Sequence, residues 1–299
     1  MSKIYNISIL LSFFGLWFTS RVPNDFEILL GFILIFTFGI FHGSNDILLI
    51  ETIANKKTKH PFFKVLAIYI FVVLSAVAVF YFIPIFALIL FILFSAFHFG
   101  EQHWENKKLE VAKLIKQIFY LSYGLLVLTI LFVFNADEVK AVIASITKYD
   151  ISKTSIKYIF FLSAIIFLIL LIYVTYKSKA LKKIILREVF YLGIFTILFK
   201  VSTLIWGFTI YFIFWHSIPS LYEQVHFIYG DFNKKSILKY CKNAFPYWLI
   251  SLIGMGIMFY LLKDKQLLYA ILFSFIAAIT FPHSLVMSKM FKNKKTQSN

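Results

Sequence analysis

Hydrophobic residues dominate this chain in long, nearly continuous runs that short clusters of lysine and other polar residues separate. The runs repeatedly reach the length of about 20 residues that a helix needs to cross a bilayer. Stretches such as 62–82 and 156–176 are almost continuously apolar, whereas the strands of a membrane β-barrel alternate over about ten residues. The pattern predicts an all-α fold, a polytopic integral membrane helical bundle that forms a single domain over residues 1–299.

The apolar runs predict about ten transmembrane helices. They cover residues 4–20, 27–50, 62–82, 84–104, 115–134, 156–176, 184–200, 203–228, 244–262 and 266–289. Only Lys200 and Ser202 separate the seventh run from the eighth, so the count becomes nine if this break is not used. The first run lacks a small-x-small cleavage site, which favours a retained helix over a secretory signal. The charged stretch 134–157 reads as an interfacial connection.

The distribution of positive charge along the chain predicts how these helices are oriented in the membrane. The formal net charge is +16, but the lysines are spread over connections and do not form one nucleic-acid-binding domain. Of the 30 basic residues, 21 fall in alternate connections and the C-terminal end, at 56–64, 107–116, 177–187, 234–242 and 289–295. The positive-inside bias therefore predicts an external N-terminus and a cytoplasmic C-terminus in the cell's inner (plasma) membrane. A single cysteine, Cys241, excludes an internal disulfide.

Histidine occurs inside four of the apolar runs, where ionisable groups are costly and usually functional. These residues are His42, His98, His216 and His283. Each lies about 13 to 16 residues from the predicted external end of its helix, which at about 1.5 Å per residue places all of them near one depth. Four imidazoles at one depth predict a shared metal ion, which a substrate would reach through the lipid bilayer or a hydrophobic tunnel.

Polar residues and prolines accompany these histidines. Asp46 lies one turn beyond His42 and could orient an imidazole, while Glu223 lies about two turns beyond His216. Pro219 predicts a kink just after His216, because a proline removes a backbone donor. Pro282 precedes His283 in the same way, and irregular backbone at membrane depth usually lines a site.

The ligand type alone leaves the metal open, because imidazole suits Fe, Zn, Cu and Ni. Octahedral iron with four imidazoles would keep two positions for dioxygen and an olefin or carbonyl, whereas tetrahedral zinc would be closed. Two other functions compete with an oxygenase. A b-type haem electron-transfer protein commonly needs arginines for the propionates, and no intramembrane arginine is present. A histidine-dependent transporter would commonly show repeats with broken helices, and none is evident.

Four short motifs occur in order over nearly the whole chain. They are Phe41-His42-Gly43-Ser44-Asn45-Asp46, Phe97-His98-Phe99-Gly100, His216-Ser217 and Phe281-Pro282-His283. This ordered set resembles the Brp/Blh family of bacterial membrane β-carotene 15,15'-dioxygenases. The resemblance implies an enzyme that uses Fe(II) and dioxygen to cleave β-carotene at its central double bond into two molecules of all-trans-retinal. Such retinal commonly serves a microbial rhodopsin, so a functional link to one is implied.

The resemblance also implies which residues bind the iron. His42, His98 and His216 match family histidines that are taken as iron ligands. The family often has a further histidine four residues after the last of these, where this chain has Ser220. His283 matches a recurrent Pro-His near the family's C-terminus, so the fourth ligand is either His283 or a group near Ser220. Residues expected to support the ligands are Asp46, Ser220, Glu223 and His103, the last at a position that is often acidic in relatives.

Overall fold

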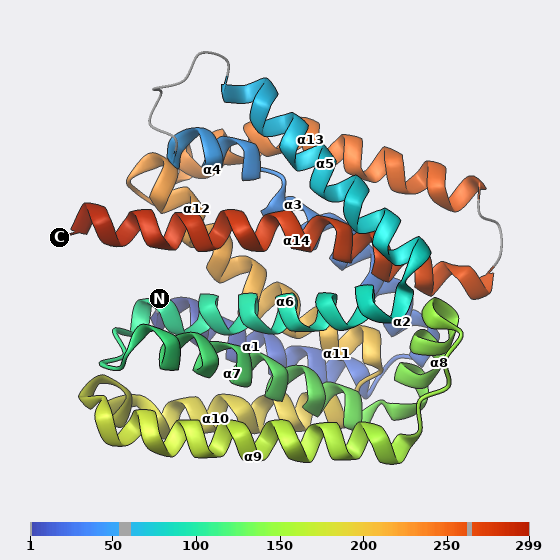
Figure 1. The fold of residues 1–299 in the computed structure, drawn as a ribbon, viewed down its shortest axis with the longest axis horizontal. Coiled ribbons are helices and arrows are strands. Elements are labelled where there is room, and N and C mark those ends of the chain that lie inside the picture. The colour runs from blue at the N-terminus through green and yellow to red at the C-terminus, as the bar shows by residue number, and fades with distance from the viewer. Residues whose placement is uncertain (1, 54–60, 262–264, 299) are drawn as a thin grey trace. The chain divides into compact units, whose positions relative to one another are not determined.

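The structure is a computed structural model that describes residues 2–53, 61–261 and 265–298. Helices account for nearly all of these residues, and the described part of the chain contains no strand, in agreement with the predicted all-α class. In chain order, the α-helices are α1 (Ser2–Thr19), α2 (Asn24–Leu34), α3 (Ile40–Gly43), α4 (Asp46–Ile53), α5 (Pro61–Phe82), α6 (Pro84–Trp104), α7 (Lys113–Phe134), α8 (Ala136–Thr147), α9 (Lys153–Lys177), α10 (Lys179–Val201), α11 (Leu204–Ile210), α12 (Ile218–Tyr229), α13 (Lys234–Leu261) and α14 (Lys265–Ser298) (Figure 1).

Every predicted apolar run is helical over most of its described residues, but two runs are not regular. The run 27–50 contains a π-helical turn, Ile35–Gly39, and a break at Ser44 and Asn45 that separates α3 from α4. The run 203–228 contains a second π-helical turn, Tyr211–Ser217, between α11 and α12. The slim break between the seventh and eighth runs is confirmed, because α10 ends at Val201 and α11 begins at Leu204.

Two helices differ from the prediction in extent. The stretch 134–157, read as an interfacial connection, contains the helix α8, which the sequence pattern did not predict. Helix α13 begins at Lys234, ten residues before the predicted start, because its first turns are basic rather than apolar. Helix α14 contains Pro282 and continues through it.

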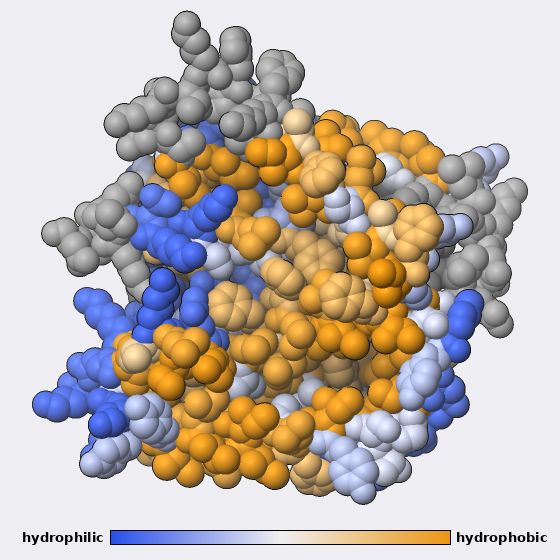
Figure 2. All heavy atoms as spheres, viewed as in Figure 1, coloured by the Kyte–Doolittle hydropathy of each residue, from blue (hydrophilic) through white to orange (hydrophobic). Residues whose placement is uncertain are grey.

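Five helical runs of the described chain are long and apolar enough to cross a membrane. They are Asn24–Ile53, Pro84–Lys107, Lys113–Phe134, Lys153–Lys177 and Leu204–Tyr229. Ile4–Thr19 and Ala67–Phe82 are shorter apolar helices. Hydrophobic side chains dominate the face shown in Figure 2, and many large apolar residues of α9 are exposed, as expected for a surface that contacts lipid.

The chain divides into two compact units. Unit 1 comprises residues 1–35, 95–144 and 148–216, and unit 2 comprises 36–94, 145–147 and 217–299. In unit 1, α7, α9 and α10 pack against one another, and α11 packs against α2 and α7 (Figure 1). In unit 2, α14 packs against α3, α4, α5 and α13, while α12 packs against α3, α4 and α13.

A pair of glycines sets the crossing of α6 and α7 in unit 1. A Cβ atom built on Gly100 would lie 1.9 Å from the carbonyl oxygen of Tyr120. A Cβ atom built on Gly124 would lie 1.8 Å from the carbonyl oxygen of Ala96. The two backbones are therefore in direct contact, which only glycine permits, and small residues serve this purpose widely in membrane helices. This contact fixes the stretch of α6 that carries His98.

Candidate metal centre

In unit 2, His42 and His283 form a buried pair although 241 positions separate them in the chain. Their ring centroids lie 4.7 Å apart at an interplanar angle of 89°, and one nitrogen of each lies within 4.8 Å of the other. The side chains come from α3 and α14, and both residues are buried. Gly43 lies beside them, since a Cβ atom there would sit 3.6 Å from Nδ1 of His283, an ordinary contact distance. The edge-to-face arrangement leaves room for both imidazoles to reach one small ion.

Hydrogen bonds fix which nitrogen each of these imidazoles presents. Nδ1 of His283 lies 2.8 Å from Oδ1 of Asp46, and Nδ1 of His42 lies 2.5 Å from the carbonyl oxygen of Gly39. Carbonyl oxygens only accept, so Nδ1 of His42 carries the proton, and a carboxylate imposes the same tautomer on His283. Nε2 is therefore the unprotonated nitrogen of both rings and the one that could bind a metal, an arrangement typical of histidines in metal sites.

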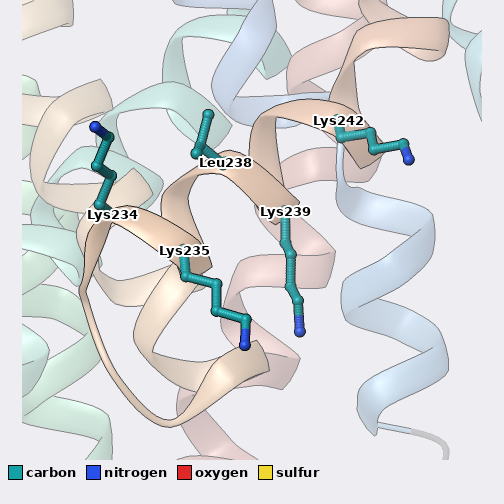
Figure 3. A pocket seen from close by; sticks show the side chains of 5 residues that line it. All are labelled: Lys234, Lys235, Leu238, Lys239 and Lys242. Atoms are coloured by element: carbon teal, nitrogen blue, oxygen red, sulfur yellow. The ribbon is translucent and has the colours of Figure 1, made fainter.

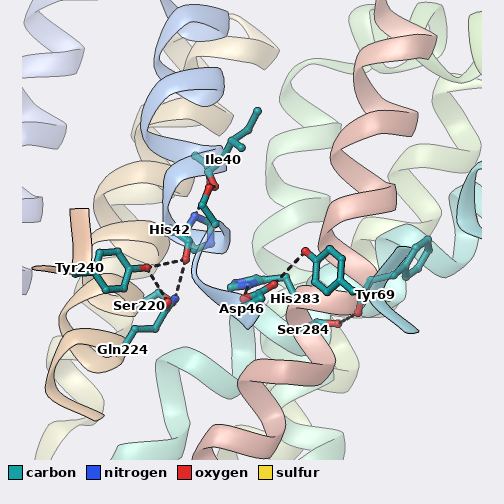
Figure 4. Close-up of polar contacts among 12 residues, drawn as sticks. Ile40, His42, Asp46, Tyr69, Ser220, Gln224, Tyr240, His283 and Ser284 are labelled. Atoms are coloured by element: carbon teal, nitrogen blue, oxygen red, sulfur yellow. Dashed lines mark hydrogen bonds and ion pairs between the residues drawn. The ribbon is translucent and has the colours of Figure 1, made fainter. Parts of the chain in front are cut away.

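Asp46 is held by a second donor. The hydroxyl of Tyr69, on α5, donates to Oδ2 of Asp46 at 3.2 Å, while Oδ1 accepts from His283 (Figure 4). Asp46 itself is buried at the first position of α4. Each carboxylate oxygen therefore has a hydrogen-bond donor, and this carboxylate links α4, α5 and α14 at the histidine pair.

The break between α3 and α4 exposes the main-chain carbonyl of His42 to side chains of other helices. Nε2 of Gln224 donates to this carbonyl at 3.0 Å, and the hydroxyl of Tyr240 lies 3.1 Å from it (Figure 4). The Tyr240 hydroxyl also lies 2.8 Å from Oε1 of Gln224, and Gln224 donates to Oγ of Ser220 at 3.1 Å. All three side chains are fully buried. This network, which we call the carbonyl clamp, anchors His42 to α12 and α13.

In unit 1, His98 and His216 form a second buried pair. Their ring centroids lie 4.7 Å apart at an interplanar angle of 79°. Phe99 meets the ring of His216 edge-on at 4.7 Å, and Phe212 stacks on it at 5.4 Å. Both histidines are almost fully buried. Aromatic side chains therefore surround the imidazole of His216.

Both π-helical turns lie at these histidines. The turn Ile35–Gly39 ends directly before α3, where its last residue accepts the hydrogen bond from His42. The turn Tyr211–Ser217 contains His216, and the adjacent Trp215 donates from Nε1 to Oγ of Ser12 at 2.9 Å. Such turns are rare and occur frequently at functional sites. The sequence predicted a proline kink just after His216; the structure has a π-helical turn that contains His216, and Pro219 lies in the first turn of α12.

The other residues expected to support the ligands lie in different surroundings. Nε2 of His103 lies 2.7 Å from Oε2 of Glu188 and 2.6 Å from Nζ of Lys107, in a buried ionic cluster of unit 1. Its ring stacks on Tyr123 at 4.7 Å. Glu223 is buried in α12. Ser220 is linked to His42 through its hydrogen bond with Gln224 in the carbonyl clamp. Sequence analysis gave no indication of Tyr69 or Tyr240, because both are aromatic residues in ordinary helical runs.

Comparison with known proteins agrees with these features. The family model for beta-carotene 15,15'-dioxygenase matches residues 33–291, which include all four histidines and most of the 299-residue chain. No curated protein and no solved structure matches the chain. The match extends from the end of α2 to the C-terminal part of α14, and it shows that this chain belongs to the beta-carotene 15,15'-dioxygenase family.

Proposed function

We propose that this protein is a non-haem iron oxygenase that cleaves β-carotene with dioxygen at the 15,15' double bond. Each carbon of that bond would receive one oxygen atom, so that the products are two molecules of all-trans-retinal. Family membership supports the reaction class. The single observation that carries the proposal is the presence of two buried imidazole pairs, His42 with His283 and His98 with His216, each with rings 4.7 Å apart.

The proposed cofactor is Fe(II), bound by His42, His98, His216 and His283. Fe(II) accepts neutral imidazole ligands, and all four residues are buried. The Asp46 carboxylate on Nδ1 of His283 supports this residue, rather than a group near Ser220, as the fourth ligand. When bound, the iron supplies the site at which dioxygen reacts with the olefin.

The side chains of the protein have separate roles in this proposal. Asp46 accepts a hydrogen bond from Nδ1 of His283 and would leave Nε2 to bind the iron, and Tyr69 donates a hydrogen bond to Asp46. The carbonyl clamp positions His42 by hydrogen bonds to its main-chain carbonyl oxygen. Phe99 and Phe212 shield His216 from water. His103 pairs with Glu188 and would act on the site through its neighbours, and Glu223 remains a proposed supporting residue that is buried in α12.

The proposed setting is a single transmembrane domain of ten helices in the plasma membrane, with an external N-terminus and a cytoplasmic C-terminus. The supporting observations are the apolar helices and the alternation of basic connections along the sequence. β-Carotene partitions into lipid, so a site within apolar helices would receive it from the bilayer. The retinal product would be available to a retinal-binding rhodopsin. Neither the haem nor the transporter alternative is favoured by the family match.

Product analysis tests the proposed reaction. The chain is expressed in a host that makes β-carotene, and the extracted pigments are separated by chromatography. We expect loss of β-carotene and appearance of retinal, and no retinal with His42→Ala, His98→Ala, His216→Ala or His283→Ala. A matched control is His226→Ala, because this histidine is exposed at the end of α12. Apocarotenals of unequal length would contradict central cleavage, and full activity of a variant would remove that histidine from the site.

A further inference from the structure

A basic groove lies along the first turns of α13, in unit 2 (Figure 3). Its lining consists of Lys234, Lys235, Leu238, Lys239 and Lys242, and its volume is about 450 Å³. All five side chains are exposed. Lys235 and Lys239 are one helical turn apart and extend in the same direction in Figure 3. The groove therefore concentrates positive charge on one side of the helix.

Ion pairs do not neutralise these lysines in the part of the chain that the structure describes, although Glu51 lines a neighbouring pocket together with Lys242. None of the four forms an ion pair within the described residues. The nearest acidic residue in sequence, Asp231, is engaged by the hydroxyl of Ser236 and by the side-chain amide of Asn233. The groove also lies at the N-terminal end of a helix, where the helix dipole adds partial positive charge. An anion bound there would meet several uncompensated ammonium groups at once.

The exposed face of α13 changes abruptly from basic to apolar. Beyond the groove, the exposed side chains are large and hydrophobic, with Phe245 at 52%, Leu249 at 40% and Ile253 at 53% exposure. The change occurs within one turn after Lys242. A helix that passes from the headgroup layer into the acyl-chain layer of a bilayer has this pattern. A ligand that follows the helix would need an anionic end and a hydrocarbon end.

We propose that the groove binds the phosphate headgroup of an anionic phospholipid, whose acyl chain lies along Phe245 and Leu249. A soluble polyanion or an acidic protein would use the lysines but gain nothing from the adjoining apolar residues. This inference does not depend on the proposed enzymatic reaction, since the groove lies on α13 and includes no histidine.

The test uses the purified full chain in a neutral detergent. Phosphatidylglycerol, phosphatidylcholine with the same acyl chains, and glycerol 3-phosphate are titrated separately, and adducts are quantified by native mass spectrometry. We expect phosphatidylglycerol to bind most tightly. The double variant Lys239→Gln and Lys242→Gln should weaken its binding about 25-fold, because each lysine near an anionic lipid contributes about five-fold. The matched control is Lys182→Gln with Lys183→Gln on α10, two exposed lysines outside the groove.

The result that would overturn the proposal is unchanged phosphatidylglycerol binding in the Lys239 and Lys242 variant. Equal binding of phosphatidylcholine would also overturn it, because the headgroup charge would then be irrelevant. Binding of glycerol 3-phosphate as tight as that of the lipid would assign the groove to a soluble phosphate. Displacement of the lipid by polyglutamate at low concentration would assign it to an acidic protein. The acyl-chain contact is tested by Phe245→Ser, which should weaken lipid binding without affecting glycerol 3-phosphate.

Discussion

Substituting Gly100 by alanine should disrupt unit 1 through one added methyl group. The new Cβ atom would lie 1.9 Å from the carbonyl oxygen of Tyr120, 2.5 Å from its carbonyl carbon and 2.9 Å from its Cα. Carbon and oxygen atoms in close contact are normally about 3.3 Å apart, so α6 and α7 would have to separate by roughly 1.4 Å. All three obstructing atoms belong to the backbone, and no side-chain rotation can relieve the clash.

The expected cost follows from this geometry. Overpacking a close-packed interior typically costs about 1–3 kcal/mol, and a rigid backbone contact belongs at the upper end of that range. Replacing glycine by alanine within a helix stabilises the helix by up to about 1 kcal/mol, because alanine has the higher helix propensity. The net loss of unfolding free energy should be about 2 kcal/mol. Because His98 lies two residues before Gly100, the same displacement should also reduce iron binding and retinal formation.

The assay compares equilibrium unfolding of purified variants in mixed micelles. Gly100→Ala and Gly124→Ala should both be destabilised, since a Cβ atom on Gly124 would lie 1.8 Å from the carbonyl oxygen of Ala96. Gly193→Ala on α10 is the matched control, because a Cβ atom there meets no atom within 4 Å. This control should be unchanged or slightly stabilised. Wild-type stability of Gly100→Ala would refute the direct backbone contact between α6 and α7.

Three further substitutions probe single interactions. Asp46→Ala should weaken iron binding about 10- to 100-fold, as metal titration can show, because His283 loses its orienting carboxylate; unchanged affinity would contradict this role. Tyr240→Phe removes one donor to the His42 carbonyl and should lower the unfolding free energy by about 1 kcal/mol. The same variant should alter the electron paramagnetic resonance spectrum of an iron–nitrosyl adduct. A purely structural role of Tyr240 would leave that spectrum unchanged. Burial raises the pKa of the Glu138 carboxyl, so the folded protein holds this proton to higher pH than the unfolded chain does. The unfolding free energy that this proton contributes should be lost as pH rises through the raised pKa. Glu138→Gln should remove this part of the pH dependence of the unfolding free energy.

Hydrophobic pattern and histidine placement account for much of the structure. All predicted apolar runs are helical over most of their described residues, and the break between the seventh and eighth runs occurs where Lys200 and Ser202 interrupt the pattern. The pattern could not predict the π-helical turns, because their residues are as hydrophobic as those of a regular helix. Nor could it predict α8, whose mixed composition suits a loop as well as an amphipathic helix.

The partners of the histidines were less predictable than the histidines themselves. Asp46 stands out as a carboxylate inside an apolar run, and the structure places it on His283 rather than on its sequence neighbour His42. Tyr69 and Tyr240 could not be singled out, because a buried tyrosine and a lipid-facing one look alike in sequence. Likewise, nothing in the sequence pattern distinguishes Gly100, where a Cβ atom would meet the backbone of Tyr120, from Gly43, whose contacts are ordinary. Such partners depend on which helices meet, and periodicity does not encode that.

The proposed function requires that both imidazole pairs bind a common iron. Its most direct test is X-ray absorption spectroscopy of the purified protein after anaerobic reconstitution with Fe(II), together with the iron content of the four single His→Ala variants. We predict one iron per chain with a first coordination sphere rich in imidazole nitrogen, and reduced iron content in variants of either pair. Full iron content and an unaltered spectrum in His98→Ala and His216→Ala would show that only His42 and His283 hold the metal and would contradict the shared centre.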